Sequence, residues 1–99
     1  MEYTKVQMVE MYEQMLLGRR YEEKVLELVN QGRLAGFFHL SIGQEAAQIG
    51  AVSALREDDY LVPTHRFHPG LVNRMDIKEM TAELLGKASG SCQGKAFTF

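Results

Sequence analysis

Apolar residues recur at helical spacing through residues 5–31, a stretch that contains no proline and few β-branched residues. Gly32 follows, at the position where a glycine commonly ends a helix. The apolar positions form two stripes that face different directions, the first at Val9, Tyr12 and Leu16 and the second at Tyr21, Val25 and Leu28. The direction changes at residues 18–20. We therefore predict either a helix that breaks there or one long helix covered on two sides, which would imply a partner surface.

Residues 36–46 read Gly-Phe-Phe-His-Leu-Ser-Ile-Gly-Gln-Glu-Ala and predict the start of a second helix. Ser41 is a favourable N-cap, because its hydroxyl can accept a hydrogen bond from an unpaired backbone N–H, and Gln44 completes a capping box. The predicted helix begins at Ile42. His39 comes just before it, where free N–H groups and the helix dipole favour a phosphate or carboxylate. The alternative is an ordinary helix start with a histidine that lines the core.

This second helix is predicted to continue to about residue 55, and it is rich in small side chains: Gly43, Ala46, Ala47, Gly50, Ala51, Ser53 and Ala54. Small residues four positions apart allow another backbone to approach closely, so we expect the helix to be buried. Glu45 is one of its few polar residues. It is either a first-turn carboxylate that the helix dipole favours or a catalytic group.

Residues 60–62, Tyr-Leu-Val, predict a short strand that ends at a proline. The loop over residues 64–70 then reads Thr-His-Arg-Phe-His-Pro-Gly, and a strand end is a common place for the polar groups of a site. His65 and His68 are three positions apart, so a metal site is one interpretation, although no Cys or Asp stands beside them at ligand spacing. Arg66 fits anion or phosphate binding better, with a salt bridge to a nearby carboxylate as the alternative.

A last helix is predicted over residues 76–86, because Asp76 is a favourable N-cap, Glu79 completes a capping box and a glycine ends the segment. Its apolar residues share one face. The glycine-rich residues 87–95 follow. They contain Cys92, which has no histidine and aspartate at a spacing that would indicate a nucleophile.

The composition is that of one small globular domain. The chain has 99 residues, 45% hydrophobic and 24% charged, and its formal net charge of −2 provides no basic surface for nucleic acid. The single cysteine excludes an internal disulfide and suits a reducing compartment. No apolar run approaches the roughly 18 residues of a membrane span, and the first residues have no signal-peptide pattern. We therefore expect a soluble cytoplasmic protein with no membrane or nucleic-acid role.

Four motifs occur in a specific order along the chain. The first is Leu-Gly-Arg-Arg-Tyr-Glu-Glu at residues 17–23, and the second is the motif already described at 36–46. The third consists of Asp-Tyr and Thr-His-Arg-Phe-His within 59–68, and the fourth of Ala-Glu-Leu-Leu-Gly-Lys and Gly-Ser-Cys-Gln-Gly-Lys within 82–95. Together they resemble the N-terminal part of the α subunit of thiamine-diphosphate-dependent 2-oxo acid dehydrogenases, the E1 component of the pyruvate, acetoin and related complexes. The resemblance extends from about residue 9 to residue 95.

The resemblance implies an enzyme that decarboxylates a 2-oxo acid, or cleaves acetoin, on thiamine diphosphate and passes the acyl or hydroxyalkyl group to a lipoyl arm. In that family the histidine at the position of His39 lies in the active-site channel, and the arginine at the position of Arg66 contacts the cofactor diphosphate. His65 precedes this arginine, and His68 lies near the reacting end. The resemblance thus implies His39 and His68 as catalytic residues, His65 and Arg66 as cofactor-binding residues, and no metal ligand.

The same resemblance implies partners. The family forms an α2β2 heterotetramer with an E1 β subunit, which acts with a lipoyl-bearing E2 component. A partner surface on the first helix agrees with this. The substrate stays open among pyruvate, acetoin and a branched-chain 2-oxo acid.

The chain departs from the family at several positions. Phe67 and Pro69 stand where relatives usually have glycine, and after residue 95 the sequence reads Ala-Phe-Thr-Phe where the family continues Gly-Gly-Ser-Met-His. The Gly-Asp-Gly segment with the asparagine that binds Mg²⁺ does not occur in this sequence. We therefore expect a truncated or frameshifted gene product.

The expected fold is mainly α with one short strand, an N-terminal fragment of an α/β thiamine-diphosphate-binding fold. It forms a single partial domain over residues 1–99, made of a helical segment (5–31), a motif-bearing segment (36–75) and a helix with a glycine-rich tail (76–99). Such a fragment would leave the helix of small residues partly uncovered, which favours association. Two functions are compatible with it: an E1 α subunit, or a catalytically inactive remnant or small helical interaction module.

Overall fold

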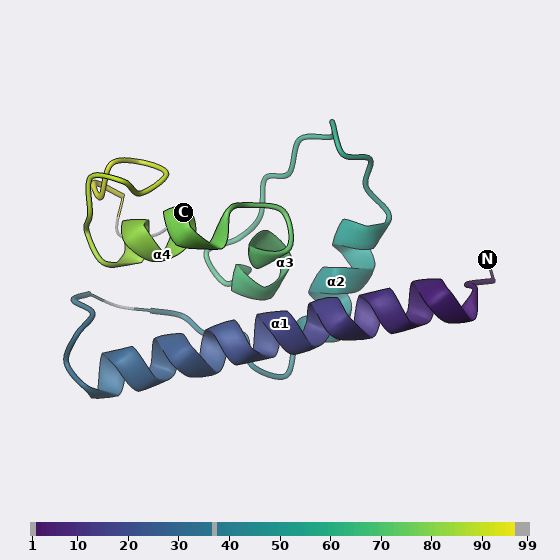
Figure 1. Cartoon of the computed structure of the whole chain (residues 1–99), viewed down its shortest axis with the longest axis horizontal. Helices are drawn as coiled ribbons and strands as arrows, with labels where there is room; N and C mark the ends of the chain where they lie inside the picture. Colours follow the sequence, from purple (N-terminus) through teal and green to yellow (C-terminus); the bar gives the residue numbers. More distant parts are fainter. Residues whose placement is uncertain (1, 37, 97–99) are drawn as a thin grey trace.

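Four helices form the regular structure of the described residues, 2–36 and 38–96, in a computed structural model of the chain. They are α1 (Lys5–Asn30), α2 (Glu45–Ser53), α3 (His68–Val72) and α4 (Ile77–Leu84). Helix α1 runs the full width of the molecule, and the three shorter helices lie along one side of it (Figure 1). α1 packs against α2 and α3, which also pack against each other. No helix in this part of the chain is both long and apolar enough to cross a membrane.

Helix α1 is continuous, so the helix predicted over residues 5–31 forms, as Lys5–Asn30 with Gln31 as its C-cap. Of the two alternatives for residues 18–20, the break does not occur. The Thr4 side chain accepts a hydrogen bond from the Gln7 amide and the Gln7 side chain accepts one from the Thr4 amide, which forms a capping box at the start. Gly32, with φ +69°, follows the end of the helix.

The two apolar stripes of α1 have different neighbours. The second stripe packs in the core, where Val25 is buried with Leu34 and Leu84. The first stripe remains largely in solvent, since Tyr12 is 60% exposed and Leu16 is 41% exposed. The change of direction near residue 18 therefore marks the border between the buried and the exposed part of α1.

Helix α2 begins later than predicted. It starts at Glu45, not at Ile42, and the Ser41 hydroxyl does not cap it. The Ser41 residue is buried, and its backbone N–H donates to the Glu22 carboxylate. Ser41 is therefore held by a contact with α1, and this long-range contact overrides its local capping preference.

Most small residues of α2 are exposed, which corrects the expectation of a buried helix. The helix buries only Glu45, Gln48, Ile49 and Val52. Apart from its chain neighbours and the backbone of its own helix, no described atom lies within 4 Å of a Cβ placed on Gly50. The expectation that this face would be partly uncovered is confirmed.

The short strand predicted at residues 60–62 does not form, and the described residues contain no strand at all. Tyr60 is 99% exposed and Val62 is 95% exposed, and the described residues offer this segment no other strand to pair with. The loop after it contains a helix that the sequence did not predict, α3, which begins at His68 with Pro69 in its first turn. The chain is thus mainly α, as expected.

Helix α4 confirms the last predicted helix, although it ends at Leu84. The Asp76 side chain accepts hydrogen bonds from the Lys78 and Glu79 amides, as expected for an N-cap. Two small core clusters join the helices: Val25, Leu34 and Leu84 in one, and Leu71, Val72 and Met80 in the other. Tyr21 of α1 packs against both clusters and links them.

Candidate functional site

The structure brings together two loops that are far apart in the sequence, and Arg66 joins them. Its Nη1 donates to the backbone oxygen of Leu40 at 2.6 Å, and its Nη2 lies 3.4 Å from Nδ1 of His39. The arginine is exposed. One edge of the guanidinium is therefore attached to the His39 loop, while the group remains accessible to a ligand.

His65 completes this cluster. Its ring lies edge-on to the ring of His39, with the ring centroids 4.7 Å apart and the planes at 79°. Both imidazoles are exposed. Three of the four residues expected at the site, His39, His65 and Arg66, thus lie side by side at the surface.

The predicted alternative for Arg66, a salt bridge, does not form among the described residues. The nearby acidic residues have another partner: Asp58 and Asp59 both form ion pairs with Arg56. Arg66 donates instead to a carbonyl oxygen and lies beside an imidazole nitrogen, so its positive charge is not neutralised there by a carboxylate. A guanidinium with two neighbouring imidazoles suits an anion with several oxygens.

His68 lies apart from this surface cluster. It is the first residue of α3, is 3% exposed, and its Nδ1 is 2.5 Å from Oε1 of Glu22. The ring of Tyr21 meets its ring edge-on at 6.5 Å. His65 and His68 therefore contact different groups, and in the described part of the chain no three His, Cys, Asp or Glu side chains are grouped to hold a metal ion.

Glu22 was not identified from the sequence as a site residue. Its side chain is fully buried, and its two oxygens take different donors: Oε2 accepts the Ser41 amide at 2.7 Å and Oε1 lies beside His68. A signal was present, because Gly18, Glu22 and Val25 share one helical face and are the buried residues of α1. A carboxylate on the buried face of an amphipathic helix requires polar partners.

Gln48 of α2 is the second buried polar residue beneath the site. Its Nε2 donates to the Arg66 carbonyl oxygen and its Oε1 accepts the Gly70 amide, both at 3.1 Å. The side chain is 4% exposed. One amide therefore supports both ends of the short segment that carries Arg66 and His68.

Glu45 forms a close ion pair with Arg19 of α1. The two groups interact through two hydrogen bonds of 2.6 and 3.1 Å, and both carboxylate oxygens also accept the Gly43 amide. The hydrogen bond from Arg19 lowers the pKa of Glu45 to about 2 despite its burial. Of the two interpretations of Glu45, the structure shows a carboxylate that is neutralised within the chain.

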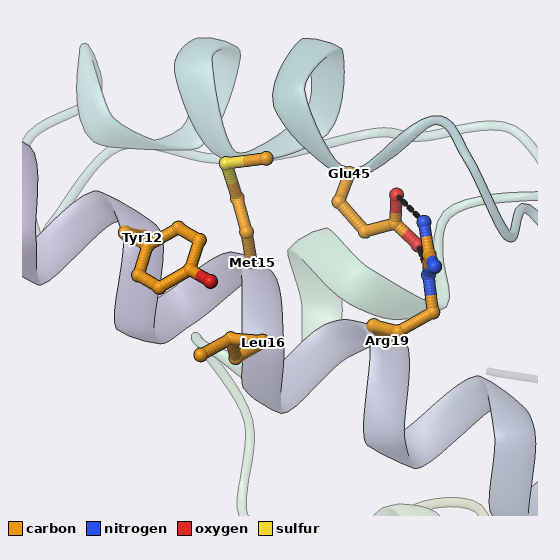
Figure 2. Close-up of a pocket in the computed structure, with 5 residues that line it drawn as sticks. All are labelled: Tyr12, Met15, Leu16, Arg19 and Glu45. Carbon is orange, nitrogen blue, oxygen red and sulfur yellow. Dashed lines mark hydrogen bonds and ion pairs between the residues drawn. The ribbon is translucent and has the colours of Figure 1, made fainter.

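This ion pair closes one end of a shallow pocket of about 210 Å³ between α1 and α2. Figure 2 shows Met15 pointing towards α2, with Tyr12 and Leu16 on the adjacent turns of α1 and the ion pair on the other side. The residues that line the pocket do not include His39, His65 or Arg66, and the pocket is mostly apolar.

Residues 12–99 match the family model described as the dehydrogenase E1 component. The chain is 44% identical over 86 residues to the α subunit of acetoin:2,6-dichlorophenolindophenol oxidoreductase from Bacillus subtilis, an alignment covering 86% of this chain and 26% of that protein. It is 37% identical over 93 residues to a chloroplastic pyruvate dehydrogenase E1 component subunit alpha-3 from rice, Oryza sativa (93% and 22% covered). It is 39% identical over 95 residues to pyruvate dehydrogenase E1 component subunit alpha from Rhizobium meliloti (95% and 27%). The chain spans about a quarter of the length of these relatives.

Proposed function

The chain belongs to the dehydrogenase E1 component family, and from this premise we propose that it acts as part of an E1 α subunit that binds thiamine diphosphate. The reaction of that subunit would be decarboxylation of a 2-oxo acid such as pyruvate, or cleavage of acetoin, with transfer of the product group to lipoamide. The names of the relatives support both substrate types. The bound cofactor would supply the carbon nucleophile and the electron sink for this chemistry.

The observation that carries the proposal is the environment of Arg66. Its guanidinium is held at the surface by the Leu40 carbonyl, has no carboxylate partner among the described residues, and lies beside His39 and near His65. In this proposal Arg66 and His65 bind the diphosphate of the cofactor, since charge-assisted hydrogen bonds to phosphate oxygens are strong and directional.

His39 and His68 would serve the reacting end of the substrate. Because an arginine can only donate, the His39 Nδ1 next to it must act as the acceptor, and the neutral ring then carries its hydrogen on Nε2. This places a donor on the edge of the imidazole opposite Arg66. His68 would act from the beginning of α3, where Glu22 orients it.

Calorimetric titration with thiamine diphosphate and Mg²⁺ tests the proposal, first on the chain alone and then on its mixture with an E1 β subunit. We expect saturable binding in the mixture. Arg66→Ala should weaken this binding by about 10- to 100-fold, because charged hydrogen bonds contribute about 1.5–3 kcal/mol.

Arg20→Ala is the matched control, since Arg20 is an exposed arginine of α1 that pairs only with Glu23 among the described residues. It should bind like the unmodified chain. No heat in either titration, or equal binding by Arg66→Ala and the unmodified chain, would contradict the proposal.

The exposed part of α1 supports a second element of the function, assembly with the E1 β subunit and, through it, with a lipoyl-bearing E2 component. Several large apolar side chains lie along one half of this helix with 40% or more of their area in solvent: Val6, Met8, Val9, Tyr12, Leu16 and Leu17. Exposed apolar surface on this scale is typical of an interaction site. If the mixture assembles but binds no thiamine diphosphate, the chain is an interaction module without catalytic function.

A further inference from the structure

We propose that Glu22 is a positioning residue for the anion-binding cluster, by which we mean His39, His65 and Arg66. Its carboxylate holds the loop that carries His39 and Ser41 in place relative to α3, and it keeps the ring hydrogen of His68 on Nδ1. The inference rests on the proposed function where it concerns ligand affinity. Its structural part, the hydrogen bonds and the ring tautomer, stands independently of any ligand.

The first argument is the position of the carboxylate. Glu22 is fully buried, and each of its oxygens has a different partner on a different segment: the Ser41 amide at 2.7 Å and the His68 imidazole at 2.5 Å. A buried carboxylate is costly unless it is well hydrogen-bonded. Glu22 therefore requires both segments to stay in place.

The second argument is how close these bonds lie to the ligand-facing residues. Ser41 directly follows Leu40, whose carbonyl oxygen accepts the hydrogen bond of Arg66. His68 comes two residues after Arg66 in the other segment. A single side chain of α1 thus connects both halves of the cluster within two residues of the groups that would touch the anion.

Gln48 supports the same segment from the other side, through the Arg66 carbonyl and the Gly70 amide. Within the described residues, its side chain makes no hydrogen bond to the loop that carries His39 and Ser41. Glu22 therefore couples the two loops from the buried side, in addition to the surface contact of Arg66 with Leu40, whereas the Gln48 side chain stabilises one loop.

The third argument concerns the tautomer of His68. An ionised carboxylate only accepts hydrogen bonds, so the His68 Nδ1 beside it must carry a hydrogen. In the neutral ring the other nitrogen, Nε2, is then the acceptor. This is the reverse of His39, where the neighbour of Nδ1 is an arginine donor and the hydrogen belongs on Nε2.

The first test needs no substitution. Long-range ¹H–¹⁵N spectra of the whole chain distinguish the tautomers of its three histidines. At a pH where the rings are neutral, we expect the Nδ1–H form for His68 and protection of the Ser41 amide from hydrogen exchange. An Nε2–H form of His68 in the unmodified chain would overturn the inference.

The second test compares Glu22→Gln with Glu23→Gln, which removes the same charge from the next, exposed position of α1. In Glu22→Gln the one amide oxygen is required to accept the Ser41 amide, so the amide nitrogen faces His68 Nδ1 and donates to it, and the ring hydrogen should move to Nε2. The affinity for inorganic pyrophosphate should fall roughly tenfold, as is typical when a residue that orients a ligand group is altered. Glu23→Gln should change neither quantity.

The outcomes separate the two proposals. If the unmodified chain binds no pyrophosphate either alone or mixed with an E1 β subunit, the proposed cofactor site fails in this chain, while the tautomer and exchange data still decide the role of Glu22. If pyrophosphate binds equally to Glu22→Gln and to the unmodified chain, or if the His68 tautomer is the same in both, the positioning role is wrong.

Discussion

At the scale of single residues, three buried carboxylates organise this chain, and each has a different set of hydrogen-bond partners. Glu22 accepts a hydrogen bond from the Ser41 amide and lies beside the His68 imidazole, and Glu45 forms an ion pair with the Arg19 guanidinium. Burial raises the pKa of Glu83, but hydrogen bonds from the backbone amides of Ala96, Gly94 and Cys92 outweigh it and lower the pKa. Glu22 and Glu45 connect α1 to other segments, and Glu83 connects α4 to residues 92–96, so the partners of these carboxylates decide where the loops lie.

The Glu45–Arg19 pair makes stability depend on pH in a defined range. The hydrogen bond from Arg19 lowers the pKa of Glu45 from 4.5 to about 2 in the folded chain. The folded state therefore binds the proton less readily than the unfolded state. The contribution of Glu45 to stability is fully present above pH 4.5 and is lost as the pH falls towards 2.

Urea unfolding at several pH values measures this. The difference in unfolding free energy between the unmodified chain and Glu45→Gln should be largest above pH 4.5 and should shrink at lower pH. Glu23→Gln, which removes an exposed ion pair, should show only a small difference. A difference for Glu45→Gln that stays constant from pH 6 down to the acid range would contradict the prediction.

At the scale of elements, the crossing of α1 and α3 depends on a glycine. A Cβ on Gly18 would lie 2.6 Å from the Cβ and 2.9 Å from the Cα of Pro69. Neither atom belongs to a flexible side-chain end, so one helix would have to move. The close contact also explains why α3 can hold His68 against α1, where Glu22 reaches it.

Two alanine substitutions test this crossing against a matched position. Gly18→Ala should destabilise the chain by about 1–3 kcal/mol, because overpacking outweighs the gain in helix propensity. Gly50→Ala, in a helix but with open space around its Cβ, should stabilise the chain by about 0.5–1 kcal/mol. Both values come from denaturant unfolding, and a stabilising Gly18→Ala would show that α3 does not pack there as described.

At the scale of the whole molecule, the described residues 2–36 and 38–96 leave two faces of the chain uncovered. One is the apolar half of α1 and the other is the face of small residues on α2. The buried apolar side chains among the described residues form a core that is modest for 99 residues: Val25, Leu34, Ile49, Val52, Leu71, Val72, Met80 and Leu84. This arrangement favours a chain that gains stability from a partner.

The partner surface can be tested on α1 directly. Tyr12→Ser combined with Leu16→Ser should weaken binding to an E1 β subunit at least tenfold by titration calorimetry, because large apolar anchors dominate interfaces. Both side chains are substantially exposed, so the fold should persist by circular dichroism. Glu13→Ser, an exposed position on the same helix, should bind normally. Unchanged affinity of the double variant would exclude this half of α1 as the interface.

Local signals in the sequence predicted much of the fold. The long helix, the Asp76 cap and the glycines that follow α1 and α4 all depend on neighbours within a few residues, and the structure confirms each of them. The roles of the expected site residues stay a prediction, although the structure brings three of these residues together. His39, His65 and Arg66 belong to two motifs, and their meeting at one place was implied by a family resemblance that the comparisons confirm.

By itself, then, the sequence determined the helices with strong caps, the mainly helical class and the family, because these are encoded in short patterns and in the order of motifs. Only the tertiary structure decided the rest. The Ser41 amide donates to Glu22, and the Ser41 hydroxyl does not cap α2. Residues 60–62 have no strand to pair with among the described residues, and the His68 ring lies against α1. The physical reason is that a hydrogen bond between residues 19 or 46 positions apart leaves no local pattern. Such a bond outweighs local preference only when the fold buries both partners together.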